Sequence, residues 1–324
     1  MTALDKIKAP IKDEMTKFDE IFKTSMKSKV SLLNIIINYI LRRKGKQMRP
    51  MFVFLSAKLN GNITENTYTA ASLIELLHTA SLIHDDVVDE SYERRGFFSI
   101  NALWRSKIAV LMGDYLLARG LLLSVEHKTY DLLEIVSEAV REMSEGELLQ
   151  IQRSRTMNIT HEQYFEIIRK KTAALISSCT ACGAKSVGCD IETVSKMKQF
   201  GEYIGIAFQI KDDLFDYQEK GLIGKPTGND IKEKKLTLPL IYALEASSIT
   251  ERRHIIRTIN KNNKNSEKIK HVVDFVISKG GLEYATKLMY EYRNKAVEIL
   301  SSYPDSDVKT SLIELVNYTI ERNK

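Results

Sequence analysis

The chain has 324 residues, of which 44% are hydrophobic and 28% charged, as in a soluble globular protein with ample material for a core. Its formal net charge of +6 is modest, and no basic stripe interleaved with aromatic residues is present, so no nucleic-acid partner is expected. Only five prolines occur, with none between Pro50 and Pro226. Long helices are therefore permitted in that stretch, which is rich in Leu, Ile, Ala, Glu and Lys, and the sequence predicts an all-α fold.

Neither the N-terminal region nor the cysteines indicate export. The N-terminus is polar and charged, and the apolar run at 30–41 is too short to cross a bilayer, so we expect no signal and no transmembrane segment. Cys179, Cys182 and Cys189 lack the fourth ligand that a structural zinc site needs. We interpret them as packing residues and predict a cytoplasmic protein.

The predicted elements follow one another without an obvious linker, so we predict a single domain over residues 1–324. One or two amphipathic helices span 1–43, a basic turn spans 44–50, and Pro50 is placed to start a helix at 51–59 that ends at 60–62. A long helix is predicted at 65–89, followed by a loop at 91–96. Further helices are predicted at 101–125, 130–153, 161–187 and 190–219, and then a non-helical insertion at 220–239 and a polar turn at 260–266.

Two aspartate triplets of identical spacing stand out in two of these helices. They are Asp85, Asp86 and Asp89 in the first, and Asp212, Asp213 and Asp216 in the second. Residues i and i+4 share a helix face, so the outer aspartates of each triplet point the same way. Carboxylates crowded among Leu, Ile and Phe repel one another and resist desolvation. Hard divalent cations relieve that cost, and Mg²⁺ is typically held by a few carboxylates together with substrate phosphates.

Basic and polar residues suited to a polyphosphate follow the triplets or lie between them. They are Arg94, Arg95, Lys171, Thr172, Gln209, Lys225 and Lys235. Two carboxylate clusters facing one cavity could hold several Mg²⁺ ions while these cations grip the same diphosphate, which would make it a good leaving group. The sequence has no phosphate-binding glycine loop, no HExxH and no nucleophile elbow, and its six histidines do not cluster.

Three segments together resemble the trans-isoprenyl diphosphate synthase family. Residues 77–91, ending in the first triplet and followed by Arg94, Arg95 and Gly96, look like its first aspartate-rich motif. Residues 45–50, Gly-Lys-Gln-Met-Arg-Pro, are similar to its GKxxRP signature. Residues 208–213, followed by 224–226 and Asp230, look like its second motif. The resemblance spans about residues 45 to 240, without a departure at the core positions.

This resemblance implies a bundle of long helices around a central cavity, and a prenyltransferase that condenses an allylic diphosphate with isopentenyl diphosphate. Asp85, Asp89 and Asp212 would be the main Mg²⁺ ligands, supported by Asp86, Asp213 and Asp216. The allylic diphosphate would be held by Arg94, Lys171, Gln209, Lys225 and Lys235, and Thr172 would stabilise the developing carbocation. Lys46, Arg49, His78 and Arg95 would bind isopentenyl diphosphate. The family's dimers imply a homodimer, and transient membrane contact for product release is left open.

Product length is predicted from two small residues. Ala80 and Ser81 lie five and four residues before Asp85. An aromatic side chain at this position would close the end of the cavity and stop elongation after about three isoprene units. The tunnel should therefore continue past Leu77, giving an all-trans product of roughly six to eight units.

Other functions stay open. A farnesyl or geranylgeranyl synthase is the first alternative. A class I terpene cyclase has no need of Lys46, Arg49 and Arg95, and a phosphohydrolase would leave the second triplet unexplained. A non-catalytic partner subunit would be expected to have lost aspartates from one triplet, whereas all six aspartates of the two triplets are present in this sequence.

Overall fold

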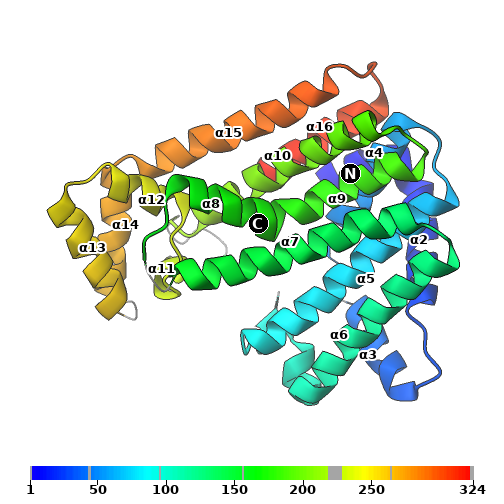
Figure 1. The fold of residues 1–324 in the computed structure, drawn as a ribbon, viewed down its shortest axis with the longest axis horizontal. Helices are drawn as coiled ribbons and strands as arrows, with labels where there is room; N and C mark the ends of the chain where they lie inside the picture. Colours follow the sequence, from blue (N-terminus) through cyan, green and yellow to red (C-terminus); the bar gives the residue numbers. More distant parts are fainter. Residues whose placement is uncertain are drawn as a thin grey trace. The chain divides into compact units, whose positions relative to one another are not determined.

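The computed structural model describes residues 2–42, 45–94, 96–154, 157–217, 228–262 and 265–321. Apart from one short hairpin, all regular elements in these ranges are helical (Figure 1), which confirms the predicted all-α class. Contacts divide the chain into two compact units. Unit 1 comprises Met1–Val140, Ser178–Lys198 and Tyr303–Leu312, and unit 2 comprises Arg141–Ser177, Gln199–Ser302 and Ile313–Lys324. The single domain predicted over residues 1–324 stays a prediction.

Unit 1 begins with four short helical elements. They are α1 (Ala3–Lys8), the 3-10 turn η1 (Ala9–Ile11), α2 (Lys12–Ser25) and α3 (Ser31–Leu41). The first is fixed by a capping box, in which Thr2 and Asp5 satisfy each other's backbone N–H groups. The structure thus divides the predicted helical region 1–43 more finely than expected.

The core of unit 1 is built on α5 (Glu65–Val88) and α6 (Ile100–Glu126). Before them, α4 (Met48–Asn60) begins two residues ahead of Pro50 and ends at Gly61. Side chains of α3, α5 and α6 form one hydrophobic cluster, which includes Ile37, Ala80 and Leu116. At Gly113 of α6 an added Cβ would lie 2.2 Å from His84 Nε2 on α5, so only glycine permits this close approach.

Between these helices the structure differs from the predicted loop at 91–96. Strands β1 (Glu93–Arg94) and β2 (Phe97–Phe98) pair antiparallel, with Arg94 opposite Phe97. The hairpin leads into α6, whose N-terminus is capped by the Ser99 hydroxyl accepting from Ala102 N. The sequence could not predict these strands, because the alternation of apolar and polar residues that indicates a strand needs a longer segment than two residues.

Helices α7 (Tyr130–Ser154), α9 (Ala174–Ser186), α10 (Ile191–Phe215) and α16 (Asp307–Glu321) contribute residues to both units. Unit 2 also holds α8 (His161–Ile168), the π-helical turn η2 (Arg169–Ala173), α11 (Asn229–Lys232) and α12 (Leu238–Glu245). It is completed by α13 (Ile249–Asn262), α14 (Ser266–Ser278) and α15 (Gly281–Leu300). The bounds of α7 agree with the predicted helix at 130–153, and α8, α9 and α10 lie within the predicted helices at 161–187 and 190–219, which the π-turn interrupts. Helix α11 and the start of α12 lie in the predicted insertion, and the sequence predicted no bounds for the later helices.

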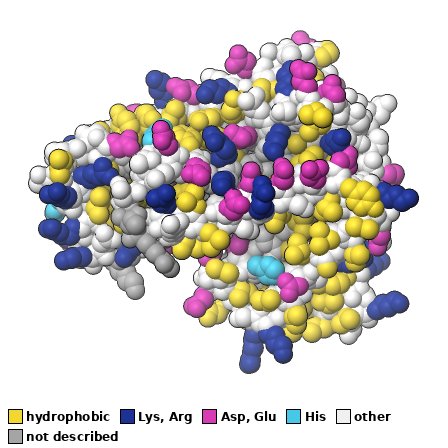
Figure 2. Space-filling view, viewed as in Figure 1, with side chains coloured by type: hydrophobic (Ala, Val, Ile, Leu, Met, Phe, Trp, Pro, Cys, Tyr) yellow, Lys and Arg dark blue, Asp and Glu magenta, His cyan; other side chains and the backbone are white. Residues whose placement is uncertain are grey.

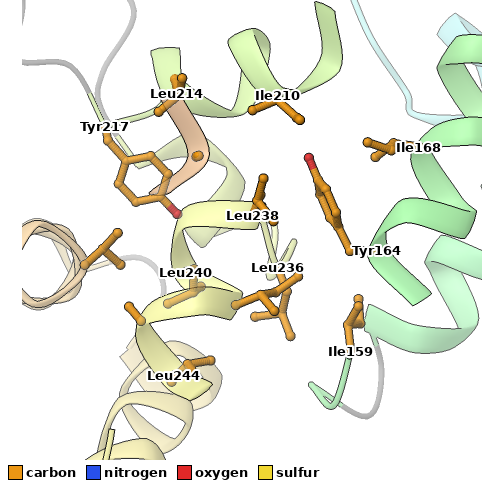
Figure 3. Packing of buried hydrophobic residues seen from close by; sticks show 14 of the residues in the cluster. Ile159, Tyr164, Ile168, Ile210, Leu214, Tyr217, Leu236, Leu238, Leu240 and Leu244 are labelled. Atoms are coloured by element: carbon orange, nitrogen blue, oxygen red, sulfur yellow. The ribbon is translucent and has the colours of Figure 1, made fainter. Parts of the chain in front are cut away.

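The core of unit 2 surrounds Tyr164, as Figure 3 shows. Its ring lies among Ile168, Ile210 and Leu238, which belong to three different helices. The same hydrophobic cluster includes residues from the end of α10 and the start of α12. Its packing therefore fixes the part of α10 that carries the second aspartate triplet.

Two further expectations concern the cysteines and the membrane. Cys179, Cys182 and Cys189 are free thiols, the first two are buried, and burial raises the pKa of Cys179 to about 12, as expected of packing residues. Among the described residues one helix, α6, is long and apolar enough to cross a membrane. A single helix is weak evidence, because core helices of soluble proteins pass the same test. The absence of a transmembrane segment stays a prediction.

Candidate functional site

Both aspartate triplets lie at the C-terminal end of a long helix. Asp85 and Asp86 occupy the last turn of α5, and Asp89 caps it. Asp212 and Asp213 occupy the last turn of α10, and Asp216 follows its end at Phe215. The helix dipole gives such an end a partial negative charge, which disfavours nearby carboxylates and favours cations. Each triplet therefore stands where a bound cation relieves the most repulsion.

In unit 1 the three aspartates of the first triplet differ in burial. Asp86 is only 5% exposed, whereas Asp85 and Asp89 are exposed. This follows from the helix period, because the outer residues share one face and the middle residue is turned about 100° away. Asp85 and Asp89 are therefore the exposed pair of this triplet, and their role as the main metal ligands stays a prediction.

Unit 1 also carries the residues expected to bind isopentenyl diphosphate. Arg49 of α4 donates from Nε to Glu75 Oε1 of α5 at 2.6 Å, and both side chains are mostly buried. His78 follows Glu75 by one helical turn, and Lys46 is exposed just before α4. The Arg94 side chain and all of Arg95 lie outside the described residues.

In unit 2, the middle aspartate of the second triplet is held by three hydrogen bonds. Asp213 is 5% exposed and accepts from Tyr164 OH at 2.8 Å, Gln209 Nε2 at 3.0 Å and Leu238 N at 3.2 Å. Burial raises the pKa of Asp213 to about 7, although the hydrogen bonds from Gln209 and Tyr164 act to lower it. The negative charge of Asp230 adds to the rise.

The last aspartate of this triplet is held by the start of α11. Asp216 accepts from Asn229 N at 2.7 Å and from Asp230 N at 3.1 Å. Burial and the neighbouring charge of Asp230 raise the pKa of Asp216 to about 6, against these two hydrogen bonds. Asp213 and Asp216 are thus oriented by hydrogen bonds from the protein itself, while Asp212 is half-buried.

Lys171 and Thr172 lie in the π-turn η2, in agreement with the frequent occurrence of π-bulges at functional sites. Two glycines allow neighbouring helices to approach this turn. An added Cβ would lie 2.7 Å from Lys171 N at Gly146 of α7, and 2.4 Å from Ala173 Cα at Gly205 of α10. Any larger residue at these two positions must displace the turn that carries the candidate side chains.

The π-turn side chains face a cavity of about 110 Å³ in unit 2. Lys171, Thr172, Gln209 and Lys235 line it together with Asp213, so the structure brings together five of the predicted substrate and catalytic residues. Lys171 Nζ donates to Gln150 Oε1 at 2.6 Å and pairs with Glu147. Thr172 Oγ1 donates to Gln209 Oε1 at 2.7 Å.

The cavity combines both charges that a metal-bound diphosphate requires. Lys235 pairs with Glu233, and although burial opposes its charge, this hydrogen bond raises the pKa of Lys235 overall. Lys225, predicted beside it, lies outside the described residues. Two ammonium groups and the buried Asp213 carboxylate thus surround one space.

No group of three or more His, Cys, Asp or Glu side chains is arranged as a metal cage within the described ranges. A complete protein cage is not required for Mg²⁺, which usually keeps waters and takes one or two carboxylates plus substrate phosphates. The donors of both triplets are carboxylate oxygens, which hard divalent cations prefer as ligands, while burial and then the charge of Asp230 raise the pKa values of Asp213 and Asp216. The residues therefore fit a hard divalent ion.

Four residues that contact the predicted site residues were not predicted from the sequence. They are Glu75, Glu147, Gln150 and Tyr164. Glu75 could have been found, because it precedes His78 by three residues and so shares its helix face. Tyr164 could not, because its partner Asp213 lies 49 residues away in sequence.

The predicted chain-length residues lie on α5 in unit 1. Ala80 and Leu77 are buried, and the Ser81 hydroxyl donates to His78 O at 2.9 Å. Ala80 belongs to the same hydrophobic cluster as Leu123 of α6.

Comparisons with known proteins identify relatives that match nearly the whole chain. A family model described as Polyprenyl synthetase matches residues 30–276. The octaprenyl diphosphate synthase of Escherichia coli (strain K12) is 34% identical, over 99% of this chain and 99% of that protein. A solved polyprenyl synthase from Caulobacter crescentus, complexed with calcium and isoprenyl diphosphate, is 32% identical with a TM-score of 0.89, covering 99% of this chain and 98% of that one. A geranylgeranyl pyrophosphate synthase from Bacteroides thetaiotaomicron is 38% identical with a TM-score of 0.84, covering 99% and 100%.

Proposed function

Because this chain belongs to the polyprenyl synthetase family and is a prenyltransferase, we propose that it condenses an allylic diphosphate with successive isopentenyl diphosphate units. The observation that carries this proposal is the unit 2 cavity, in which Lys171, Thr172, Gln209 and Lys235 meet the second triplet. A terpene cyclase would use a similar cavity, but it has no need of a second diphosphate site such as Lys46 and Arg49 would form.

In the proposed mechanism, Lys171 and Lys235 bind the allylic diphosphate and retain it after ionisation. The Thr172 hydroxyl, fixed by Gln209 at 2.7 Å, presents its oxygen toward the developing carbocation. Lys46, Arg49 and His78 orient isopentenyl diphosphate, whose alkene attacks that carbocation. The released diphosphate then takes up the proton lost from the new chain.

Asp85, Asp89 and Asp212 would hold Mg²⁺, which when bound would neutralise the charge that builds on the leaving diphosphate. Asp213 and Asp216 would keep the second triplet in place through their hydrogen bonds to Tyr164, Leu238 N and the start of α11. The calcium in the Caulobacter crescentus enzyme supports a divalent ion, and the proposal of Mg²⁺ rests on the all-oxygen ligand set.

We propose a product of roughly six to eight isoprene units, based on the small residues Ala80 and Ser81 one helical turn before Asp85. The octaprenyl relative supports this length, whereas the geranylgeranyl relative supports a shorter product. Chromatography of the product made from labelled isopentenyl diphosphate separates the two. A wild-type product of twenty carbons or fewer would refute the long chain while leaving the reaction intact.

Ala80→Phe tests the tunnel directly. Ala80 is 3% exposed and belongs, with Leu123, to the hydrophobic cluster of α3, α5 and α6. An aromatic ring at this position should therefore block the tunnel. The variant should make a product of about fifteen to twenty carbons while the first condensation stays fast, because the change does not touch the metal ligands. An unchanged product would contradict the tunnel.

We also propose a homodimer that works in the cytoplasm. Figure 2 shows hydrophobic side chains gathered over α6 at the lower right of the visible face. Leu111, Leu121, Leu122 and Val125 of this helix are 54%, 41%, 49% and 49% exposed, and exposed apolar side chains gathered on one surface indicate an interaction site. Symmetric pairing would bury it. Light scattering that gave a monomer mass would refute the dimer.

A further inference from the structure

The segment around α3 is strongly basic and also exposes apolar side chains. Residues 21–45 contain six Lys or Arg and no Asp or Glu. Among the described residues of unit 1, Lys23, Lys27, Lys29 and Arg42 are exposed and flank α3. Val30, Leu32 and Ile35 are 54%, 40% and 57% exposed between these cations.

The apolar side chains form one edge that continues beyond α3. Ile36 and Ile37 point into the core, so Leu32 and Ile35 lie on a different side of the helix. One turn after Ile35, Tyr39 donates to Phe98 O of the hairpin at 2.8 Å. Phe97 and Phe98 are themselves 52% and 54% exposed. We call Val30, Leu32, Ile35, Phe97 and Phe98, together with Lys23, Lys27, Lys29 and Arg42, the α3 face.

A hollow of about 200 Å³ opens on another side of α3, beside Asn34, Asn38 and Leu41. Lys23, Lys27, Asn34 and Asn38 line it, so two ammonium groups and two carboxamides border a space large enough for a phosphate group. No ion pair engages either lysine within the described ranges, and an anion would find both charges available. Exposed basic residues thus flank an exposed apolar edge in this segment, a combination that is also found in helices that lie in the membrane interface.

We propose that the α3 face docks on an anionic lipid bilayer, with its apolar edge entering the headgroup region and its lysines contacting lipid phosphates. This deepens the proposed function, on which it rests, because a product of six or more isoprene units is far more soluble in a bilayer than in water. A second copy of the chain fits less well. A symmetric contact would place this basic cluster against itself, and like charges at an interface repel.

The test is flotation of the full-length protein, without substrates, on vesicles of phosphatidylcholine with phosphatidylglycerol and on vesicles of phosphatidylcholine alone. Binding is expected to the anionic vesicles and to fall steeply as salt is raised. Lys27→Gln with Lys29→Gln should weaken it about 25-fold, since each basic residue contributes about fivefold. Leu32→Ser with Ile35→Ser should weaken it about tenfold or more.

Matched controls separate the α3 face from charge and hydrophobicity in general. Lys268→Gln with Lys270→Gln removes the same charge from an exposed part of α14, and Ile191→Ser removes an apolar side chain that is 86% exposed. Neither should change binding by more than about twofold. Equal weakening by controls and α3 variants, or equal binding to uncharged vesicles, would overturn the proposal.

The outcomes also distinguish this inference from the proposed function. Vesicle binding with a short product would leave the α3 face intact and refute the chain length. A long product made by a protein that does not bind the anionic vesicles would do the reverse. If the α3 variants instead became monomeric while their vesicle binding was unchanged, the face would be an interface between copies, and the membrane proposal would fail.

Discussion

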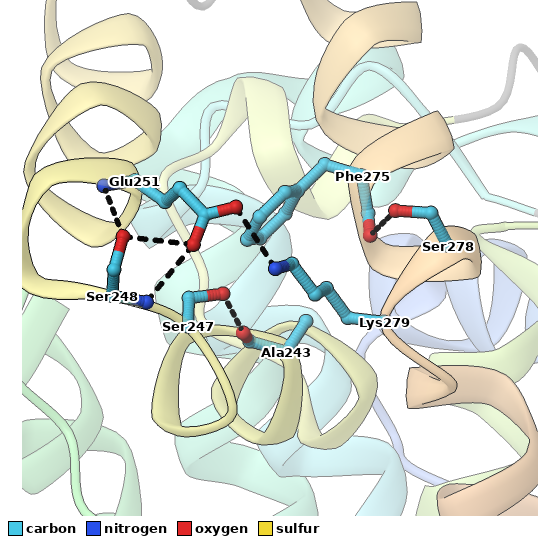
Figure 4. A network of polar contacts seen from close by, with 7 residues as sticks. All are labelled: Ala243, Ser247, Ser248, Glu251, Phe275, Ser278 and Lys279. Atoms are coloured by element: carbon cyan, nitrogen blue, oxygen red, sulfur yellow. Dashed lines mark hydrogen bonds and ion pairs between the residues drawn. The ribbon is translucent and has the colours of Figure 1, made fainter.

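Two hydrogen-bonded carboxylates of unit 2, Asp213 and Glu251, respond to their surroundings in opposite directions. Asp213 accepts three hydrogen bonds, yet burial raises its pKa to about 7. Glu251 at the start of α13 accepts from Lys279 at 2.9 Å, from Ser248 N at 2.9 Å and from Ser248 Oγ at 2.8 Å (Figure 4). Led by the Lys279 hydrogen bond, these contacts lower the pKa of Glu251 to about 2.

The difference lies in burial and in the cation. Glu251 is exposed to solvent and has a lysine beside it, whereas Asp213 is buried beside a second carboxylate, Asp230. Neutral hydrogen bonds from Tyr164 and Gln209 do not balance the desolvation of a charge. A carboxylate kept under such conditions is destabilising for the fold alone. We infer that the carboxylate oxygens of the second triplet suit a bound divalent cation.

The strongest test removes the outer carboxylates. Asp85→Ala or Asp212→Ala should lower turnover by about a thousandfold or more, equivalent to about 4 kcal/mol of transition-state stabilisation. The fold should survive, because removing one of several repelling carboxylates relieves strain. Steady-state kinetics with and without chelator, alongside circular dichroism, measure both effects. Undiminished turnover in chelator or in either variant would contradict a metal-dependent site.

A second test disturbs the backbone that presents the cations of the cavity. Gly205→Ala would place Cβ 2.4 Å from Ala173 Cα and must displace the π-turn carrying Lys171 and Thr172. A shift of about 1 Å should lower kcat about a hundredfold. The KM for isopentenyl diphosphate should not change, which separates mispositioning from general unfolding.

The matched control is Gly61→Ala, where an added Cβ meets only Val187 atoms at 3.3 Å or beyond. It should stay within about threefold of wild type. Similar losses in both variants, or a loss in Gly205→Ala that parallels its thermal stability, would argue against a role for the close approach at the π-turn.

A third test concerns a carboxylate that already has its cation, Glu75 with Arg49. The pair is 2.6 Å long and mostly buried, so Glu75 should fix the guanidinium that orients isopentenyl diphosphate. Glu75→Ala should raise the KM for isopentenyl diphosphate about tenfold with little change in kcat. Glu75→Gln keeps an acceptor and should recover part of this loss. A fall in kcat alone would make Glu75 a structural residue.

The sequence predicted most of these elements but not how they are held. Spacing alone predicted that Asp85 and Asp89 share a face, and the absence of proline predicted the long helices around them. The π-turn could not be predicted, because a π-bulge depends on packing at Gly146 and Gly205 rather than on the residues inserted. The Tyr164 hydrogen bond to Asp213 was equally hidden, since it joins helices distant in sequence. Lys225 and Arg95, outside the described residues, stay predictions.

The smallest expected effect is on stability at Glu251, and its sign follows from the lowered pKa. Glu251 titrates near 4.5 when unfolded and near 2 when folded, so the folded state binds fewer protons between these values. Its contribution to the free energy of unfolding is therefore present above about pH 4.5 and is lost as the pH falls toward 2. Glu251→Gln should be less stable than wild type at neutral pH, and the gap should close steadily below pH 4.5.

Thermal unfolding of both proteins across this pH range measures the gap. Because Glu251 is at the surface, high salt should reduce the gap as well. The control is Glu291→Gln, whose pair with Lys287 is 3.9 Å long within one exposed helix face and should contribute little at any pH. A gap that stayed constant from neutral pH into the acid range would show that Glu251 acts through its capping hydrogen bonds to Ser248, which glutamine can partly replace, and not through its charge. In that case the contrast with Asp213 would rest on burial alone, and the need for a cation at the second triplet would lose this support.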